Sequence, residues 1–214
     1  MSYIPTQHIS SSDPTVNDDI GDGFVVGSVW VTTTDGDMFV CQDNSSGAAV
    51  WKSVSSPMVF LGRHTESNNA DGGTATSGGW QDYVFNEETN DLTEGLVDLN
   101  TSTGVITLTK GYAYFFRVAI LFRAVDSCKI HLLDTTESET YPGGTGYLYS
   151  SENMADSIYL MTVVDLRDET VSDHDVKVQY QVETTASGNG LGEACNFSTE
   201  EVYGHVLVKV LREL

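Results

Sequence analysis

Residues 176–182 read Val-Lys-Val-Gln-Tyr-Gln-Val, and residues 206–210 read Val-Leu-Val-Lys-Val. In both stretches the residues on one alternating face are apolar, which is the period of a β-strand with one side on a core. No stretch of the chain joins a sustained 3.6-residue apolar period to a helix cap at its start. These segments therefore predict an all-β fold.

Further strand-like segments surround these two, and turn signals separate them. Turns are indicated by Ser-Thr-Gly at 102–104, Pro-Gly-Gly at 142–144 and Ser-Gly-Asn-Gly at 187–190. Many short strands with regular turns are typical of a sandwich or barrel. We expect residues 80–214 to form an antiparallel jelly-roll sandwich. Its clearest predicted strands are 81–85, 105–108, 113–125, 128–133, 146–150, 157–166, 176–183 and 202–211.

The most apolar of these strands is at 113–122, Ala-Tyr-Phe-Phe-Arg-Val-Ala-Ile-Leu-Phe. Apolar residues occupy both of its alternating faces. A strand buried on both sides needs a partner on its outer face, either a second sheet edge or another subunit. We expect the second case, and the candidate subunit-interface residues are Tyr114, Phe116, Val118, Ile120 and Phe122.

The N-terminal region carries a smaller β pattern. Short β-like runs lie at 27–32, 37–42 and 48–54, with a hairpin signal, Asp35-Gly36, between the first two. Three such strands bury too little surface to be stable alone. We expect a small three-stranded β-meander module, whose large apolar residues are Trp30, Phe39 and Trp51.

The segments that flank this module lack a clear strand pattern. Residues 67–79 read Ser-Asn-Asn-Ala-Asp-Gly-Gly-Thr-Ala-Thr-Ser-Gly-Gly, a composition typical of a flexible linker. The first residues are polar and without an apolar period, which indicates an arm with no core of its own. We therefore predict four parts, namely an arm at 1–12, the β adaptor module at 13–56, a linker at 57–79 and the head at 80–214. Candidate attachment residues in the arm are Tyr3, Ile4 and Ile9.

Composition excludes several classes of partner. Ten Lys and Arg against 31 Asp and Glu give a net charge of −21, which repels nucleic acid and disfavours anionic lipid. The longest apolar stretch is interrupted by Arg117 and Arg123, so no membrane insertion is expected. Three cysteines without CxxC spacing fit reduced thiols, and the first residues lack the pattern of a secretory signal. We expect synthesis in a cytoplasm.

Motifs of known enzyme chemistry are absent from the sequence. There is no GxSxG, no P-loop, no GxGxxG before a helix and no HExxH. The five histidines are scattered, and the dense trio Asp173-His174-Asp175 is explained equally well by a polar loop. A glycosidase pair among the 31 acidic residues is neither supported nor excluded. We expect no catalytic residues and no metal ligands, and we expect that the chain is not an enzyme.

Two acidic clusters and one group of tyrosines leave alternatives open. Neither cluster has the spacing of an EF-hand, so we expect no cofactor, with structural calcium as the less favoured alternative. Tyr141, Tyr147 and Tyr149 either form an exposed binding loop or face the core. The clusters are Asp13, Asn17, Asp18, Asp19 and Asp22, and Asp165, Asp168, Glu169, Asp173 and Asp175.

The N-terminal module resembles a small module that is common in fibre and appendage proteins of tailed phages. The resemblance rests on four stretches in order, which are Asp-Pro-Thr-Val-Asn-Asp-Asp at 13–19, Val-Gly-Ser-Val-Trp-Val at 26–31, Met-Phe-Val-Cys at 38–41 and Gly-Ala-Ala-Val-Trp at 47–51. It implies a β-rich adaptor or spacer within a fibre-like virion protein.

The C-terminal part resembles the C1q/TNF-like jelly roll. The resemblance rests on Val-Asp-Leu-Asn-Thr-Ser-Thr-Gly-Val-Ile-Thr-Leu at 97–108 and Lys-Gly-Tyr-Ala-Tyr-Phe-Phe at 110–116. Near the end, Tyr203-Gly204 lacks the serine of the family pattern, and no collagen-like stalk precedes the head. The resemblance implies a homotrimer in which aromatic-rich strands meet around a three-fold axis. It does not carry over the receptors of animal homologues.

Together these features predict a non-enzymatic virion protein of a tailed phage. It would be a homotrimeric head or tail fibre or capsid decoration protein, held to other capsid or tail proteins through its N-terminal region. A strongly acidic surface keeps such a many-copy protein soluble. The alternative is a receptor-binding module that recognises host cell-surface glycans through jelly-roll loops, because sandwich folds host lectins as well. A depolymerase-like enzyme is a third, disfavoured interpretation, because the head is short for a substrate groove.

Overall fold

The structure is a computed structural model that describes residues 5–34, 37–54, 58–93, 95–152, 154–169, 172–195 and 197–211. The contacts between Cα atoms divide the chain into a unit that precedes Met58 and a unit that begins there. Within the described ranges, two 3-10 turns, η1 (Ile20–Asp22) and η2 (Ser150–Glu152), are the helical elements, and the others are strands. Neither turn is long enough or apolar enough to cross a membrane. The predicted all-β class is confirmed.

The N-terminal unit is a four-stranded sheet in the order β1-β2-β3-β4. Strands β2, β3 and β4 pair antiparallel and form the predicted meander. Strand β1 pairs parallel with β2 and comes from residues predicted to form an arm without a core. The hairpin signal Asp35-Gly36 lies outside the described residues. The strands span Gln7–Ser10 (β1), Val29–Thr32 (β2), Met38–Asp43 (β3) and Val50–Ser53 (β4).

An aromatic cluster explains why the arm belongs to this unit. The ring of His8 lies 4.1 Å from the buried Trp30 ring between centroids, and Trp51 packs edge-on against Trp30 at 5.7 Å. The indole nitrogen of Trp30 donates to the carbonyl oxygen of Ser12 at 2.8 Å, and that of Trp51 donates to the carbonyl oxygen of Asp18 at 2.9 Å. Part of the predicted arm therefore supplies an exposed ring that packs on the buried Trp30 and a hydrogen-bond acceptor for its indole.

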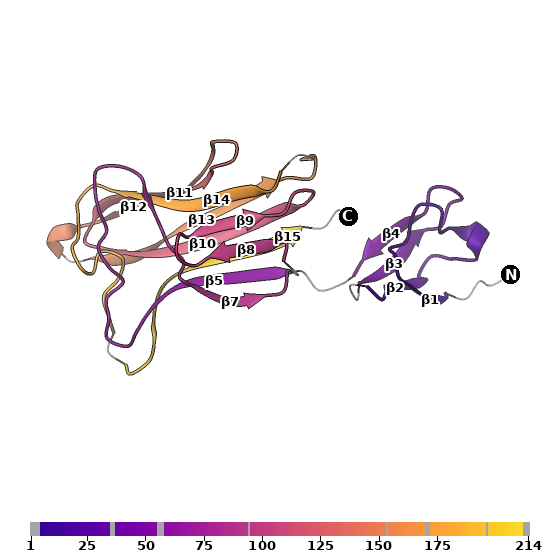
Figure 1. The fold of residues 1–214 in the computed structure, drawn as a ribbon, viewed down its shortest axis with the longest axis horizontal. Coiled ribbons are helices and arrows are strands. Elements are labelled where there is room, and N and C mark those ends of the chain that lie inside the picture. The colour runs from indigo at the N-terminus through magenta and orange to yellow at the C-terminus, as the bar shows by residue number, and fades with distance from the viewer. Residues whose placement is uncertain are drawn as a thin grey trace. The chain divides into compact units, whose positions relative to one another are not determined.

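The second unit consists of two sheets, whose strands Figure 1 shows running along one another. Sheet I has the order β13-β10-β15-β5-β7, and its strands are Ala155–Asp165, Ala113–Arg123, Glu201–Leu211, Val59–Glu66 and Glu87–Asp91 in that order. Sheet II has the order β12-β11-β14-β9-β8, and its strands are Glu139–Leu148, Asp126–Asp134, His174–Val182, Val105–Leu108 and Val97–Asn100. The short β6 (Gln81–Asp82) pairs with β14.

The chain passes back and forth between the two sheets. From β9 onward it enters sheet I at β10, returns to sheet II for β11 and β12, and then alternates through β13, β14 and β15. All strand pairs of this unit are antiparallel, and the crossing pattern is that of a jelly roll. The space between the sheets holds a continuous apolar cluster that includes Phe60, Ile106, Phe116, Val178 and Val208. The predicted antiparallel jelly-roll sandwich is confirmed.

The structure corrects the predicted linker at 57–79. Val59–Glu66 forms β5, which lies between β15 and β7 in sheet I. The segment that follows also returns to the sandwich, since Gly73 and Ala75 form bridges to Asn189 and Ala186. The head therefore begins at Met58 and not at residue 80. The strand was missed because two of its inward-facing residues, Gly62 and His64, are not large apolar residues. The sequence therefore shows no apolar alternation here, although both residues are buried.

Candidate functional site

The five side chains predicted at a subunit interface lie in the core between the two sheets. Tyr114, Phe116, Val118, Ile120 and Phe122 are all 0% exposed within a single chain. A second chain cannot reach side chains that the first chain already encloses, so these residues are core residues. The opposite face of β10 is the one that looks away from sheet II.

That outer face of sheet I carries three cross-strand rows, which we call the outer rows. Across β13, β10, β15 and β5 they are Val163–Phe115–Lys209–Val59, Met161–Arg117–Leu207–Leu61 and Tyr159–Ala119–His205–Arg63. Tyr159, Met161 and Val163 on the edge strand β13 are 49%, 60% and 45% exposed. Phe115, Leu61 and Leu207 in the middle are half-buried. Large exposed apolar patches of this kind mark interaction sites.

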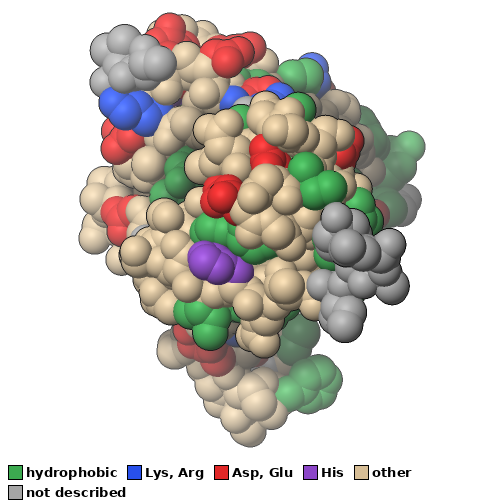
Figure 2. Space-filling model, turned by 90° about the vertical axis from the view of Figure 1, so that its right-hand side faces the viewer, with side chains coloured by type: hydrophobic (Ala, Val, Ile, Leu, Met, Phe, Trp, Pro, Cys, Tyr) green, Lys and Arg blue, Asp and Glu red, His purple; other side chains and the backbone are tan. Residues whose placement is uncertain are grey.

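The outer rows differ in charge from the rest of the chain. They contain no Asp or Glu but hold Arg63, Arg117 and Lys209, in a chain of net charge −21. Burial, together with the charges of Arg117 and Arg63, lowers the pKa of His205, so this histidine is neutral at pH 7. On the face drawn in Figure 2, by contrast, acidic side chains are spread among polar ones and basic side chains are few. Across these four strands the outer rows therefore form an apolar, weakly basic stripe on an acidic protein, and β7 places Glu87 opposite Arg63 at its margin.

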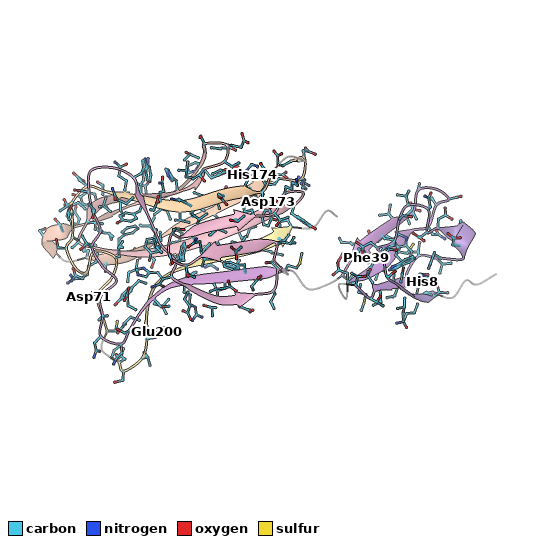
Figure 3. The ribbon with its side chains drawn as sticks, viewed as in Figure 1. His8, Phe39, Asp71, Asp173, His174 and Glu200 are labelled. Carbon is cyan, nitrogen blue, oxygen red and sulfur yellow. The ribbon has the colours of Figure 1, made fainter. Side chains whose placement is uncertain are left out.

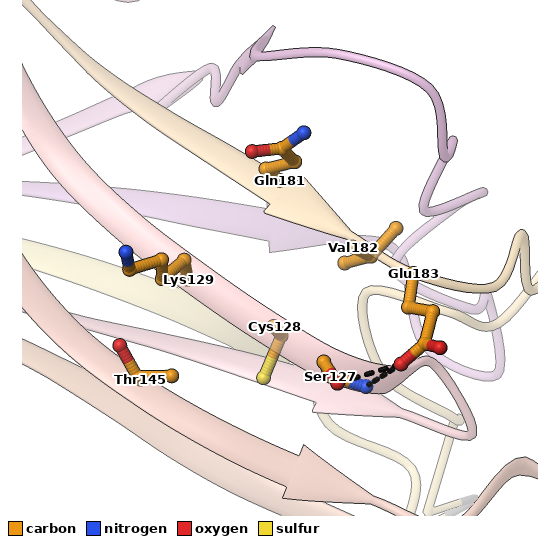
Figure 4. Close-up of a pocket in the computed structure, with 7 residues that line it drawn as sticks. All are labelled: Ser127, Cys128, Lys129, Thr145, Gln181, Val182 and Glu183. Atoms are coloured by element: carbon orange, nitrogen blue, oxygen red, sulfur yellow. Dashed lines mark hydrogen bonds between the residues drawn. The ribbon is translucent and has the colours of Figure 1, made fainter.

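Sheet II carries a different feature on its outer face, a shallow polar hollow of about 400 Å³ (Figure 4). Within it the hydroxyl of Ser127 donates to the carboxylate of Glu183 at 2.6 Å. Burial raises the pKa of the Cys128 thiol to about 11, so the hollow holds no activated thiolate there. The residues that line the hollow are Ser127, Cys128, Lys129, Thr145, Gln181, Val182 and Glu183.

Two exposed tyrosines lie beside this hollow. Tyr147 is opposite Ser127 in the ladder of β11 and β12, and its ring centroid lies 4.8 Å from that of Tyr149. The two side chains are 53% and 50% exposed. Tyr141, by contrast, packs partly buried against the core, and its hydroxyl donates to Glu139 at 2.9 Å. The sequence left open whether these tyrosines are exposed or face the core. Tyr147 and Tyr149 are exposed, and Tyr141 packs against the core.

The two acidic clusters that the sequence singled out serve mainly to fix turns. In the first, Asp19 accepts hydrogen bonds from the backbone N–H groups of Gly47 and Gly21, which lower its pKa. In the second, Asp165 pairs with Arg167 at 2.6 Å, an interaction that lowers the pKa of Asp165. Asp173 and Asp175 accept from the Lys110 backbone and the Thr107 hydroxyl. These carboxylates are therefore engaged with the protein itself.

Glu169 of the second cluster instead belongs to a group of side chains around His174. Figure 3 labels His174, which lies toward one end of the sandwich. The Nδ1 atom of His174 lies 2.6 Å from the Asp134 carboxylate, and both side chains are buried. Burial alone would lower the pKa of His174. The hydrogen bond to Asp134 and the negative charges of Asp134, Glu169 and Glu137 have the larger combined effect, so the pKa is raised. Potential ligand atoms of Glu137, Glu169 and His174 all lie within 4.8 Å of one another.

Sequence reasoning missed this group because its members come from distant segments. Asp134 ends β11, Glu137 lies in the following turn, Glu169 precedes β14 and His174 begins it. The sequence signals were the trio Asp173-His174-Asp175 and the place of Glu169 in the second acidic cluster, but the two aspartates of the trio bind other partners. The attachment candidates Tyr3 and Ile4 lie outside the described residues, whereas Ile9 is 63% exposed on β1.

Comparisons with known proteins find likeness of fold only. No family model matches the chain, and no curated protein matches it. The crystal structure of murine APRIL at pH 5.0 aligns with a TM-score of 0.45 at 11% identity and covers 72% of this chain and 99% of that chain. The structure of Eiger TNF from S. frugiperda aligns with a TM-score of 0.43 at 11% identity, covering 75% and 96%.

Proposed function

We propose that the chain is a non-enzymatic structural protein of a tailed-phage virion that acts as a homotrimer. Its N-terminal unit attaches to other capsid or tail proteins, and its jelly roll forms the head of a fibre or decoration. The virion role is supported by the resemblance of residues 13–52 to the phage adaptor module. Self-association is supported by the outer rows of sheet I, and this observation carries the proposal.

The charge distribution indicates where copies of this chain can meet. Two chains of net charge −21 repel each other over most of their surface. Across β13, β10, β15 and β5 the outer rows lack carboxylates, and they present Phe115, Leu207 and Leu61 beside the exposed apolar residues of the edge strand β13. Each large apolar side chain that becomes fully buried contributes roughly 1.5–3 kcal/mol. Association through this face thus gains apolar burial where repulsion is weakest.

A ring of three copies also uses the basic residues of the outer rows. Contacts in a three-membered ring are heterologous, so the face of one copy meets a different surface of the next. Arg63, Arg117 and Lys209 then lie opposite a surface that is acidic over most of the protein. This complementarity favours the trimer over a symmetric face-to-face dimer, in which the basic residues would oppose one another.

The test is the mass of the full chain in solution at micromolar concentration, measured by light scattering. We expect a trimer for the wild-type chain and a monomer for Tyr159→Glu, which places a charge on the outer rows. Tyr147→Glu is the matched control, since Tyr147 and Tyr159 are 53% and 49% exposed on opposite sheets. A monomeric wild-type chain, or equal effects of the two substitutions, would reject the proposal.

Attachment through the N-terminal unit needs its own test. Deleting residues 1–12 would also remove β1 and the carbonyl acceptor of Trp30, so a point substitution is cleaner. We expect Ile9→Asp to leave a folded trimer that no longer copurifies with phage particles. Val26→Asp is the control, because Val26 is 58% exposed in the same unit but lies outside its strands. Normal incorporation of Ile9→Asp would show that this part of β1 is not the anchor.

The alternative function, recognition of host glycans, is favoured by one observation of its own. A polar hollow flanked by two exposed tyrosines offers hydrogen-bonding groups and flat apolar rings together, which suits a small polar ligand. A glycan array probed with the full chain tests it. Binding that is lost in Tyr147→Ala and kept in Tyr159→Ala would establish the alternative, and an array without bound glycans would reject it.

A further inference from the structure

A buried histidine at one end of the sandwich has a ring nitrogen for which the described part of the chain supplies no hydrogen-bond partner. His174 is 3% exposed, and its Nδ1 atom lies 2.6 Å from an oxygen of Asp134, which is 1% exposed. The Nε2 atom of His174 is buried and has no hydrogen-bond partner among the described residues. A buried polar atom left in this way is costly, so its environment calls for an explanation.

The groups that face this nitrogen are carboxylates. An oxygen of Glu169 lies 3.8 Å from Nε2, beyond hydrogen-bond distance, and Glu137 completes the group. An ionised Asp134 can only accept, so Nδ1 carries the donated hydrogen and Nε2 of the neutral ring is an acceptor. An acceptor that faces two further acceptors requires a cation between them, which is either a proton or a metal ion.

We propose that His174, Glu169 and Glu137 bind a divalent transition-metal ion such as Zn²⁺ through Nε2 and two carboxylate oxygens. Asp134 supplies the second feature of such sites, since a metal-binding histidine usually donates its other N–H to a carboxylate. One imidazole and two carboxylates suit zinc or a neighbouring first-row metal. Calcium fits less well, because it takes about six to eight oxygen ligands.

The distances require only a small closure of the site. Ligand atoms about 2.0–2.1 Å from a tetrahedral zinc ion lie about 3.3 Å from one another. The 3.8 Å between His174 Nε2 and Glu169 is close to this value, and the ligand atoms span no more than 4.8 Å. Glu137 is exposed in a turn, so its side chain can move toward a metal held by the fixed imidazole, and the Glu169 carboxylate already lies 3.8 Å from that imidazole.

A bound ion would join three segments of the second unit. Glu137 lies in the turn between β11 and β12, Glu169 lies between β13 and β14, and His174 begins β14. These positions are separate from the outer rows and from the polar hollow. The site therefore has a structural role in the head that is independent of how copies of the chain assemble.

The experiment uses the full chain, freed of metal with a chelator and titrated with ZnCl₂ alone. Calorimetry is expected to show one zinc ion per chain, and zinc is expected to raise the melting temperature. Glu169→Gln and Glu137→Gln each remove one ligand charge, and each should weaken binding at least about tenfold. Asp168→Asn is the matched control, because it removes the same charge from an exposed neighbour of Glu169, and it should bind like the wild-type chain.

A direct readout at the histidine avoids replacing a buried residue. Zinc should shift the ¹⁵N NMR resonance of His174 Nε2 and leave Nδ1 protonated. Absence of one-to-one binding would overturn the proposal. Equal zinc binding by Glu169→Gln and Asp168→Asn would also overturn it, because it would indicate that zinc is attracted to the acidic chain without a specific site. Tighter binding of Ca²⁺ than of Zn²⁺ would also overturn it.

Discussion

At the scale of single residues, His64 shows how a buried polar side chain is accommodated inside sheet I. Its Nδ1 atom and the hydroxyl oxygen of Tyr83 share a hydrogen bond at 2.8 Å, while its Nε2 atom lies 3.5 Å from the carboxylate of Glu66. Gly204 on β15 lies directly against the Tyr83 ring, where any Cβ atom would overlap the hydroxyl group. A glycine is therefore required here by the close approach of a side chain and not by a turn.

We expect Gly204→Ala to lower the free energy of unfolding by about 1–3 kcal/mol, because the new methyl group displaces Tyr83 from His64. Urea denaturation of the full chain measures this loss. Gly79→Ala is the control, since nothing lies within 4 Å of the added carbon there, and its effect should stay within about 0.5 kcal/mol. Equal effects of both substitutions would contradict the assigned packing.

Acid should weaken the fold through His64. Burial lowers the pKa of this histidine, and the nearby Glu66 opposes that effect only in part. The unfolded chain, with an ordinary histidine pKa near 6.5, then binds a proton more readily than the folded chain. The contribution of His64 to stability is therefore intact above pH 6.5 and declines as the pH falls below this value toward the folded pKa. Denaturation at pH 7.5 and pH 5.5 should show a smaller loss for His64→Gln than for the wild-type chain.

At the scale of elements, β10 presents two apolar faces with different roles. Its residues alternate between the core, where Phe116 is 0% exposed, and the outer rows, where Phe115 is half-buried. The sequence showed that both faces were apolar, and the structure shows that one of them packs against sheet II, while a partner for the other face stays a prediction. Alternation alone could not decide which face meets sheet II, because both sets of side chains are large and apolar.

Neighbouring substitutions on β10 should separate these roles. Phe116→Ala is expected to cost about 3–5 kcal/mol of unfolding free energy, because it opens a cavity between the sheets. Phe115→Ala removes a half-buried ring and should cost only about 1 kcal/mol in the isolated chain, while it weakens association. Thermal unfolding and light scattering of both variants measure the two effects. A larger stability loss for Phe115→Ala would mean that the faces are assigned the wrong way round.

Two elements explain where prediction from the sequence failed. Strand β5 pairs with β15, far along the chain, and its buried glycine and histidine do not produce an apolar alternation. Pro142-Gly143-Gly144 was interpreted as a turn but lies within β12, where a Cβ on Gly144 would lie 2.5 Å from the carbonyl oxygen of Tyr159. Glycines in a strand can mark a close backbone approach as well as a turn. The sequence alone does not distinguish the two cases.

At the scale of the whole molecule, the chain is built from two units with separate cores. The N-terminal unit depends on the rings of Phe24, Trp30 and Trp51, and the second unit depends on the cluster between its two sheets. The class of each unit followed from strand alternation, which is local. The outer rows and the His174 group each combine several segments, and only the folded chain brings them together.

Separate cores predict separate responses to mutation. We expect Trp30→Ala to destabilise the N-terminal unit by about 3–5 kcal/mol, enough to unfold so small a sheet. Hydrogen exchange followed by mass spectrometry should then show rapid exchange in β2 and β3, with unchanged protection in β14. Loss of protection in β14 as well would show that the two units depend on each other for stability.

The pairing of β5 with β15 also determines how the second unit would respond to mechanical load. These strands enter and leave the unit, and they are antiparallel, with Val59 opposite Lys209 and Glu66 opposite Glu201. Force applied between the start of β5 and the end of β15 acts at the same end of the ladder and pulls across its hydrogen bonds. The bonds then open one after another, as in a zipper, instead of resisting together in shear. The second unit loaded in this way would yield at low force along this seam, and any chain that covers sheet I would reinforce it.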